Sequence, residues 1–140
     1  MKILLAADGS NYTQKALDFI AANKQSLELQ GELVVIYVQI PLPTGFNVVM
    51  GFEEAQKLHG LEAEEVFKPI RKFLGEHAMT CRCVTKIGPV VNEIIDTANT
   101  EHVHMIVMGT HGRDLLSRAV MGSVAQKVVA QSTVPVLLVK

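Results

Sequence analysis

A regular alternation of short apolar runs with segments of helical spacing is the feature that most constrains this chain. Continuous apolar runs, which are typical of strands covered on both faces, fall at residues 2–7, 32–38, 104–109 and 134–139. The run at 80–87 alternates only in part and is expected to form a strand near a sheet edge. Five strands are therefore predicted, separated by segments of a different kind.

The intervening segments repeat apolar residues at helical spacing, which predicts helices over about residues 13–29, 52–77, 89–98 and 123–132. Ser10 or Asn11 can cap the first helix, because a short side-chain oxygen accepts from the free N–H groups there, and Gly31 is expected to end it. Pro69 lies inside the second helix, removes one hydrogen bond and should kink it. Residues 41–51 are rich in Pro and Gly and are predicted to form a loop.

Strands that alternate with helices predict an α/β fold of three layers, in which a parallel sheet with right-handed crossovers carries helices on both faces. The 140 residues are the size of one ordinary domain, so residues 1–140 are predicted to form a single domain. About half of the residues are hydrophobic (49%) and few are aromatic (5%), which indicates an aliphatic core. In such sheets ligands bind beyond the carboxyl ends of the strands, where the strand order reverses.

The charge and composition of the chain exclude several classes of binding partner. The net charge of −1 gives no indication of a surface for nucleic acid or for an anionic membrane. The apolar runs are well short of a membrane span of ~20 residues, and Asp8 follows the first run too closely for a signal peptide. Cys81 and Cys83 lie two residues apart, would share one face of a strand and are expected to be free thiols in a cytoplasmic protein.

The segment 107–126, "VMGTHGRDLLSRAVMGSVAQ", carries the strongest functional signal. Gly109 and Gly112 follow a predicted strand, and Gly122 and Ser123 begin the next helix. The free N–H groups and positive dipole end of a helix favour phosphate, and the Ser123 hydroxyl adds a donor. Both ends of the segment therefore suit an oxyanion, provided that the residues between them fold back. The alternative is that the glycines only make tight turns.

Charged residues within this segment have weaker expectations. Arg113 and Arg118 could help to neutralise phosphate, but charged side chains usually mark exposed faces and these two are expected to be solvated. The segment is not a P-loop, because it lacks G-K-[ST], and it is not G-x-G-x-x-G.

Asp8 and the histidines are the other candidate polar groups. Asp8 ends the first strand and could accept hydrogen bonds from a ribose or a base, or hold a metal; the alternative is a helix cap or an Asx-turn. His111 lies in the glycine loop, where contact with backbone or ligand is expected rather than catalysis. His102 and His104 have a strand-like spacing without an evident third ligand, so no metal site on protein ligands is expected.

The chain resembles the universal stress protein family over essentially its full length. The stretches "MGTHG" (108–112) and "GSVAQKVV" (122–129) match the family's nucleotide motif G-x2-G-x9-G-[ST], and "AADGS" and "VPVLLV" match as well. The resemblance implies a Rossmann-like sheet, of the adenine nucleotide alpha hydrolase-like type, with strand order 3-2-1-4-5. It also implies the ATP-binding branch of the family. With ATP bound, a Mg²⁺ ion held mainly by the phosphates is the expected form of metal, because no protein metal site is evident.

The same resemblance implies a set of cofactor-binding residues. Carried over by position, Ala7 and Asp8 would contact the adenosine, and Val38 would meet adenine through its backbone. Residues in and next to the motif would surround the ribose and the phosphates. They are Met108, Gly109, His111, Gly112, Gly122, Ser123 and Val124. One departure from the family pattern is Asp114, an acid that could repel phosphate.

Three functional hypotheses follow. The first is an ATP-binding regulatory module of the stress response. The second is a slow ATPase or nucleotidyl-transfer enzyme, although no convincing hydrolytic base is evident. The third is an interaction protein that binds no nucleotide.

The last predicted strand bears on assembly. Residues 134–139 would form an edge strand without charged residues, which predicts a homodimer through antiparallel pairing, as the resemblance also implies. The alternative is that a loop or helix of the same chain covers this edge.

Overall fold

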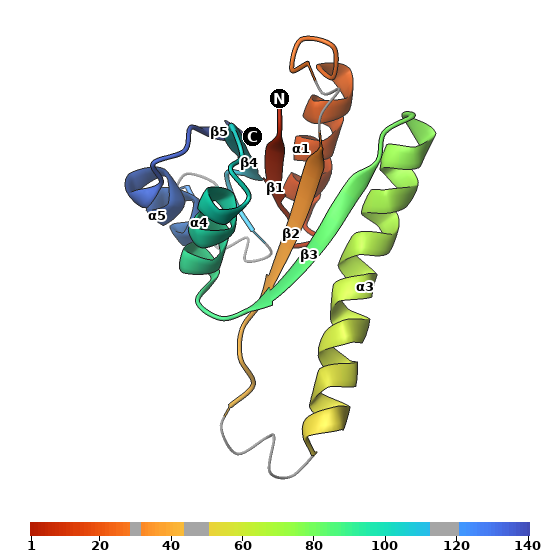
Figure 1. The fold of residues 1–140 in the computed structure, drawn as a ribbon, viewed down its shortest axis with the longest axis vertical. Coiled ribbons are helices and arrows are strands. Elements are labelled where there is room, and N and C mark those ends of the chain that lie inside the picture. The colour runs from red at the N-terminus through yellow and green to blue at the C-terminus, as the bar shows by residue number, and fades with distance from the viewer. Residues whose placement is uncertain (29–31, 44–50, 113–120) are drawn as a thin grey trace.

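Five parallel strands form the central layer of the protein (Figure 1). The computed structural model describes residues 1–28, 32–43, 51–112 and 121–140. The strand order is β3-β2-β1-β4-β5, which confirms the predicted order and fold class. The strands are β1 (Ile3–Ala6), β2 (Leu33–Gln39), β3 (Cys81–Ile87), β4 (Met105–Gly109) and β5 (Val136–Val139).

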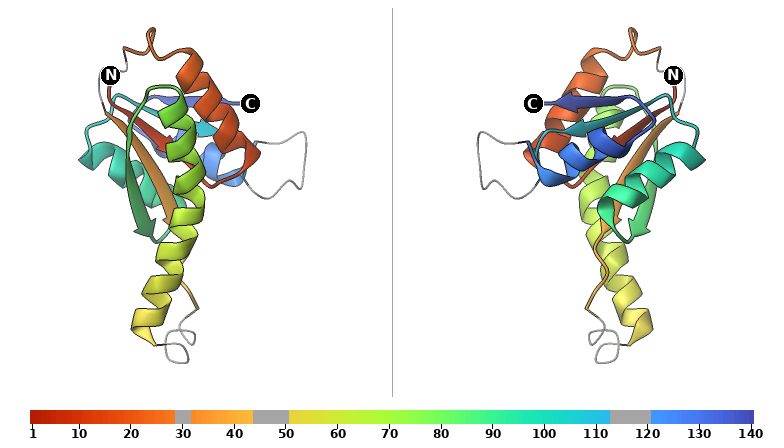
Figure 2. Two further views of the ribbon diagram at one scale, coloured as in Figure 1. Left: turned by 90° about the vertical axis from the view of Figure 1, so that its right-hand side faces the viewer. Right: turned by 90° about the vertical axis from the view of Figure 1, so that its left-hand side faces the viewer.

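Helices cover both faces of this sheet (Figure 2). One face carries α1 (Asn11–Ala22) and α3 (Phe52–Glu76), and the other carries α4 (Val90–Thr100) and α5 (Ser123–Gln131). The strands bury side chains in both directions. Ile3 and Leu5 pack beneath α1 and α3, whereas Leu4 packs beneath α4 and α5, and all three are fully buried. Burial on both faces explains why the central strands are continuously apolar.

The first helix is shorter than its apolar spacing predicts. Ser10 caps it, because the Ser10 Oγ accepts from the Thr13 N–H at 3.4 Å. It ends at Ala22 rather than near residue 29, because the C-cap residue Asn23 donates its side-chain Nδ2 to the Phe19 carbonyl, which also accepts the last helical N–H. Asn side chains compete for backbone groups in this way and favour helix ends. Leu27 lies in the following turn and still packs on the core.

Gly31, the predicted end of the first helix, lies outside the described residues. So do residues 44–50, which make up most of the predicted 41–51 loop.

The long helix α3 reaches well beyond the sheet. It contains 25 residues without interruption, and Pro69 lies inside it without ending it. Its amino-terminal half extends past the carboxyl ends of the strands, as Figure 1 shows.

On the other side of the sheet, Pro89 is the N-cap residue of α4 and the helix begins at Val90. β3 is an edge strand, as predicted, and pairs with β2 along its whole length.

Candidate functional site

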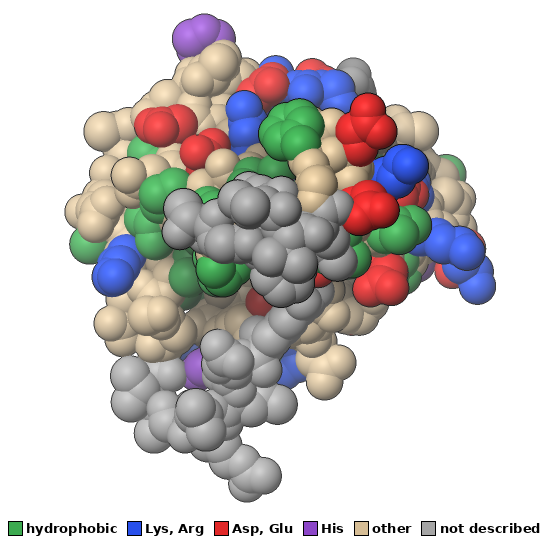
Figure 3. All heavy atoms as spheres, turned by 90° about the horizontal axis from the view of Figure 1, so that it is seen from below, with side chains coloured by type: hydrophobic (Ala, Val, Ile, Leu, Met, Phe, Trp, Pro, Cys, Tyr) green, Lys and Arg blue, Asp and Glu red, His purple; other side chains and the backbone are tan. Residues whose placement is uncertain are grey.

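The carboxyl ends of β1, β2 and β4 meet the start of α5 around a cleft of about 510 Å³. The chain leaves β1 toward β2 and β3 and then crosses back to β4, so the strand order reverses between β1 and β4. A crevice at such a point is the usual ligand site of parallel α/β sheets. Figure 3 views the molecule from this side, where exposed hydrophobic and acidic side chains lie close together.

Every residue of the predicted cofactor-binding set lines this one cleft. The end of β1 contributes Ala7 and Asp8, and β2 contributes Val38. The remaining members come from β4 with its following loop and from the start of α5: Met108, Gly109, His111, Gly112, Gly122, Ser123 and Val124. Arg113, Asp114 and Arg118 lie outside the described residues.

Asp8 is held rigidly in the turn that joins β1 to α1. Its Oδ1 accepts from the Ser10 N–H and from the Thr13 hydroxyl, both at 2.9 Å, and its own N–H donates to Thr13 Oγ1 at 3.1 Å. Gly9 between them has a φ of +75°, a conformation that favours glycine. The Asx-turn geometry is therefore present, and it fixes the carboxylate at the edge of the cleft.

The three motif glycines face three different neighbours. A Cβ added at Gly109 would lie 2.4 Å from Tyr12 Cβ, so glycine is needed there for α1 to pack closely on β4. A Cβ at Gly112 would lie 2.8 Å from Asp8 Oδ2, and one at Gly122 would lie 3.2 Å from the Thr110 carbonyl oxygen. Gly109 thus has a packing reason that the motif alone does not reveal, Gly112 leaves room for the Asp8 carboxylate, and Gly122 lets the start of α5 approach the loop after β4 closely.

The two ends of the glycine segment come together. The Gly122 N–H donates to the Thr110 carbonyl at 2.8 Å, which ties the start of α5 to the loop after β4. Gly122 is the N-cap of α5 and no side chain caps the helix among the described residues, so the N–H groups of its first turn have no intrahelical partner. An anion in the cleft would meet these donors and the positive end of the helix dipole.

The opposite part of the cleft suits a flat apolar group with polar edges. The last paired residues of β1 and β2 are Ala6 and Ile36, and the Ala7 N–H donates to the Ile36 carbonyl at 2.9 Å. Val38 lies two residues further along β2, so its backbone groups point over the end of β1. Val90, Ile94 and Met108 add apolar surface to this part of the lining.

Sequence reasoning missed the contribution of α3 to the cleft. Gln39, at the end of β2, is only 3% exposed. Its Nε2 donates to the His59 carbonyl at 3.0 Å and to Glu62 Oε2 at 2.9 Å. Within the described ranges, Gln39 Oε1 and His59 Nδ1 are buried without a hydrogen-bond partner. The only signal in the sequence was one amide in an otherwise apolar strand, and nothing indicated that α3 would approach it.

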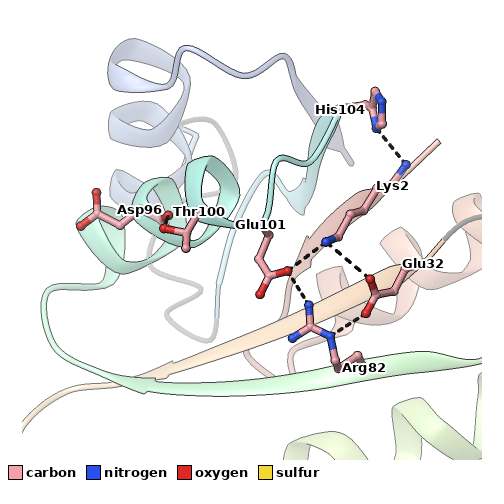
Figure 4. Close-up of polar contacts among 7 residues, drawn as sticks. All are labelled: Lys2, Glu32, Arg82, Asp96, Thr100, Glu101 and His104. Carbon is pink, nitrogen blue, oxygen red and sulfur yellow. Dashed lines mark hydrogen bonds and ion pairs between the residues drawn. The ribbon is translucent and has the colours of Figure 1, made fainter.

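The histidines do not assemble a metal centre. His104 Nδ1 accepts from the Lys2 N–H at 3.0 Å, at the end of the sheet opposite the cleft (Figure 4). His111 Nδ1 lies 3.0 Å from Thr110 Oγ1. The His111 ring packs against the Tyr12 ring, with the ring centroids 5.0 Å apart. In the part of the chain that the structure describes, no three His, Cys, Asp or Glu side chains could share a metal ion. The described helices also include none long and apolar enough to cross a membrane.

The fold and the cleft define a doubly wound α/β protein with a cleft at its switch point. The model of the universal stress protein family matches residues 1–140. Universal stress protein MJ0531 of Methanocaldococcus jannaschii is 31% identical over 140 residues, which cover 99% of this chain and 81% of that protein. The chain therefore belongs to the universal stress protein family.

Solved structures share this fold. The structure of protein MJ0577 from the same organism has a TM-score of 0.82 and 29% identity, covering 99% of this chain and 94% of that one. A universal stress protein from Archaeoglobus fulgidus, solved in complex with dAMP, has a TM-score of 0.72 and 20% identity over 100% of this chain and 98% of that one.

Proposed function

We propose that this protein is an ATP-binding regulatory module of the stress response. The observation that carries the proposal is the arrangement at the switch point. Asp8 Oδ2, Gly112, Gly122 and the uncapped start of α5 all border one cleft, and a Cβ at Gly112 or Gly122 would crowd Asp8 Oδ2 or the Thr110 carbonyl, which belong to the same site. Small residues, helix N–H donors and a fixed carboxylate are the groups that phosphate and ribose require. The dAMP bound by the Archaeoglobus fulgidus relative supports an adenine nucleotide.

In this proposal, different parts of the cleft bind the adenine, the adenosine moiety and the phosphates of the nucleotide. The backbone of Val38 and the apolar side chains near it receive adenine, and Ala7 and Asp8 receive the adenosine moiety. The loop after β4 and the first turn of α5 receive the phosphates, with Ser123 adding its hydroxyl. Mg²⁺, where present, is held mainly by the phosphates, since such ions keep several waters and few protein ligands. The protein acts in the cytoplasm, where its two free cysteines stay reduced.

The direct test is calorimetry with ATP on the wild-type protein and on Gly122→Val. The Cβ at this position would lie 3.2 Å from the Thr110 carbonyl oxygen and 3.3 Å from His111 Cα, so valine would push the start of α5 away from the loop after β4 and separate the two ends of the proposed phosphate site. We expect the variant to stay folded by circular dichroism and to lose ATP binding. Undiminished affinity in the folded variant would contradict the phosphate site.

The rival functions have their own readouts. A slow ATPase or nucleotidyl-transfer enzyme would form product from ATP above a blank without protein. An interaction protein that binds no nucleotide would give neither calorimetric heat nor a nucleotide in mass spectra of the denatured purified protein. We expect a co-purified adenine nucleotide and no product above the blank.

A further inference from the structure

Two thiols lie side by side on the edge strand β3, far from the cleft. The sulfur atoms of Cys81 and Cys83 are 3.9 Å apart, and neither cysteine forms a disulfide. Both side chains are half-buried and pack against the core beneath α1 and α3. They stand in the first half of β3, whereas the cleft lies beyond the carboxyl ends of the strands. This pair is therefore independent of the proposed nucleotide site.

One cation is fixed next to this pair. Arg71 of α3 places Nη1 3.6 Å from Cys83 Sγ. Its guanidinium group lies 6.0 Å from the centroid of the Phe67 ring and forms an ion pair with Glu64 on the same helix. Contacts with Glu64 and Phe67 thus hold the guanidinium group beside Cys83.

We propose that Cys81 and Cys83 form a bidentate binding site for a soft, thiophilic cation of the Cu(I) class. A metal ion bound to thiolate lies about 2.3 Å from the sulfur, taking zinc as the reference. Two such bonds span more than the 3.9 Å between the sulfurs, so one ion reaches both without movement of the backbone. Thiolate ligands select Cu(I), zinc and iron–sulfur clusters, and of these structural zinc and the clusters take four protein ligands, more than this pair supplies.

The charges and protons of this step balance. As each copper–sulfur bond forms, the thiol concerned releases its proton to solvent, and no electron is transferred. Two thiolates and one Cu(I) leave one negative charge in the complex. The Arg71 guanidinium group lies close enough to offset that charge.

The geometry disfavours the two obvious alternatives. Residues two apart on a strand have Cα atoms about 6.6 Å apart, which is near the upper limit for a disulfide. Unbroken pairing with β2, from Leu33–Cys81 to Gln39–Ile87, resists the bend that would shorten this distance. Structural zinc takes four protein ligands, and the described residues offer no group of three.

The test is an anaerobic titration of the reduced full-length protein with Cu(I), in competition with the chromophoric chelator bicinchoninate. We expect one tightly bound Cu(I) per chain. Cys81→Ser and Cys83→Ser should each weaken binding by more than the roughly 10- to 100-fold that loss of an outer-shell partner costs, and Arg71→Gln should fall within that range. Lys86→Ser, which places the same residue at an exposed position of β3, should bind like the wild type.

Several outcomes would overturn the proposal. The proposal is wrong if the wild type binds Cu(I) no more tightly than the double variant Cys81→Ser/Cys83→Ser. It is also wrong if either single variant is folded by circular dichroism and binds Cu(I) like the wild type. X-ray absorption of the loaded protein must show two sulfur ligands, and a shell of only nitrogen and oxygen would also refute the site.

Discussion

At the scale of single residues, the close contact between Gly109 and Tyr12 makes Gly109 a folding residue. An added Cβ would lie 2.4 Å from Tyr12 Cβ, a distance that requires α1 or β4 to shift. Overpacking of this kind typically costs about 1–3 kcal/mol. Gly109→Ala should therefore lower the free energy of unfolding by about that amount in urea denaturation.

Matched controls separate this clash from a general effect of alanine. Gly60 and Gly75 lie in α3, and a Cβ at either would meet nothing within 4 Å. Gly60→Ala should raise the free energy of unfolding by roughly 0.5–1 kcal/mol, because alanine is the better helix former. Gly109→Ala should cost less in a Tyr12→Gly background, since the two residues are in contact. Equal costs in the two backgrounds would refute the contact.

Asp8 combines a turn with a position at the cleft, and two substitutions separate these roles. Losing a charged hydrogen-bond acceptor costs about 1.5–3 kcal/mol, so Asp8→Ala should weaken ATP binding roughly tenfold or more. It should also lower stability, because Ser10 and Thr13 both donate to Asp8 Oδ1. Asp8→Asn keeps an acceptor for the turn and removes the charge. It should retain the wild-type melting temperature and bind ATP more weakly in calorimetry; unchanged affinity would leave Asp8 with the turn alone.

At the scale of secondary-structure elements, an ion-pair network joins four segments at the amino ends of the strands (Figure 4). Lys2 Nζ lies 2.9 Å from Glu101 Oε2 and 3.4 Å from Glu32 Oε2. Arg82 of β3 contacts the same two carboxylates, each at 2.5 Å. The network thus connects the start of β1, the residue before β2, the edge strand and the end of α4.

This network predicts an acid-dependent loss of stability. Hydrogen bonding from Arg82 lowers the pKa of Glu32, and hydrogen bonding from Lys2 lowers the pKa of Glu101. A carboxyl with a lowered pKa stabilises the fold above its ordinary value near 4.5 and loses this contribution as the pH falls through the lowered value. Arg82→Gln should therefore lower the free energy of unfolding near pH 7, and its difference from the wild type should shrink in acid.

Urea denaturation at several pH values checks this prediction. The pairs are partly exposed, so added salt should also reduce the difference between wild type and variant. Glu76→Gln is the control, because the Lys72–Glu76 pair is 4.0 Å apart and largely exposed. It should change little at any pH. A difference for Arg82→Gln that stays constant into acid would exclude the carboxylates as its source.

The elements that sequence predicted best are those whose environment is uniform. β1, β2 and β4 are covered on both faces, so their apolar runs are unbroken and fall close to the predicted bounds. The end of α1 was misplaced, because the apolar spacing continues to Leu27 while Asn23 is the C-cap residue and its side chain donates to the Phe19 carbonyl. The strand order came from the family resemblance.

The candidate site could be predicted where it depends on groups that lie close together in the sequence. Backbone turns and a helix start, such as those at Gly112 and Gly122, leave a spacing in the sequence. The contact between Gln39 and α3 leaves none, because it depends on how a distant helix crosses the end of β2. The same holds for Tyr12 against Gly109.

At the scale of the whole molecule, the exposed edge of β5 is the feature that bears on assembly. β5 is the last strand of the sheet, and all four of its residues are only partly buried. The carbonyls of Pro135 and Val139 accept from the N–H groups of Ile106 in β4 and of Thr110 just after it, so the alternate residues Val136 and Leu138 direct their backbone groups outward. An uncharged edge with free donors favours pairing with another chain. We propose an isologous homodimer in which β5 pairs antiparallel with its copy.

Light scattering after size exclusion at micromolar protein should then give about twice the mass of the 15.3 kDa chain. Leu138→Pro should shift the mass toward a single chain, because proline removes an outward donor while the bonds to β4 come from neighbouring residues. Leu138→Ala loses a comparable side chain but keeps the N–H, and it should remain a dimer. If both variants dissociate equally, side-chain packing rather than strand pairing holds the dimer. A wild-type mass of one chain across the dilution range would refute the β5 dimer altogether.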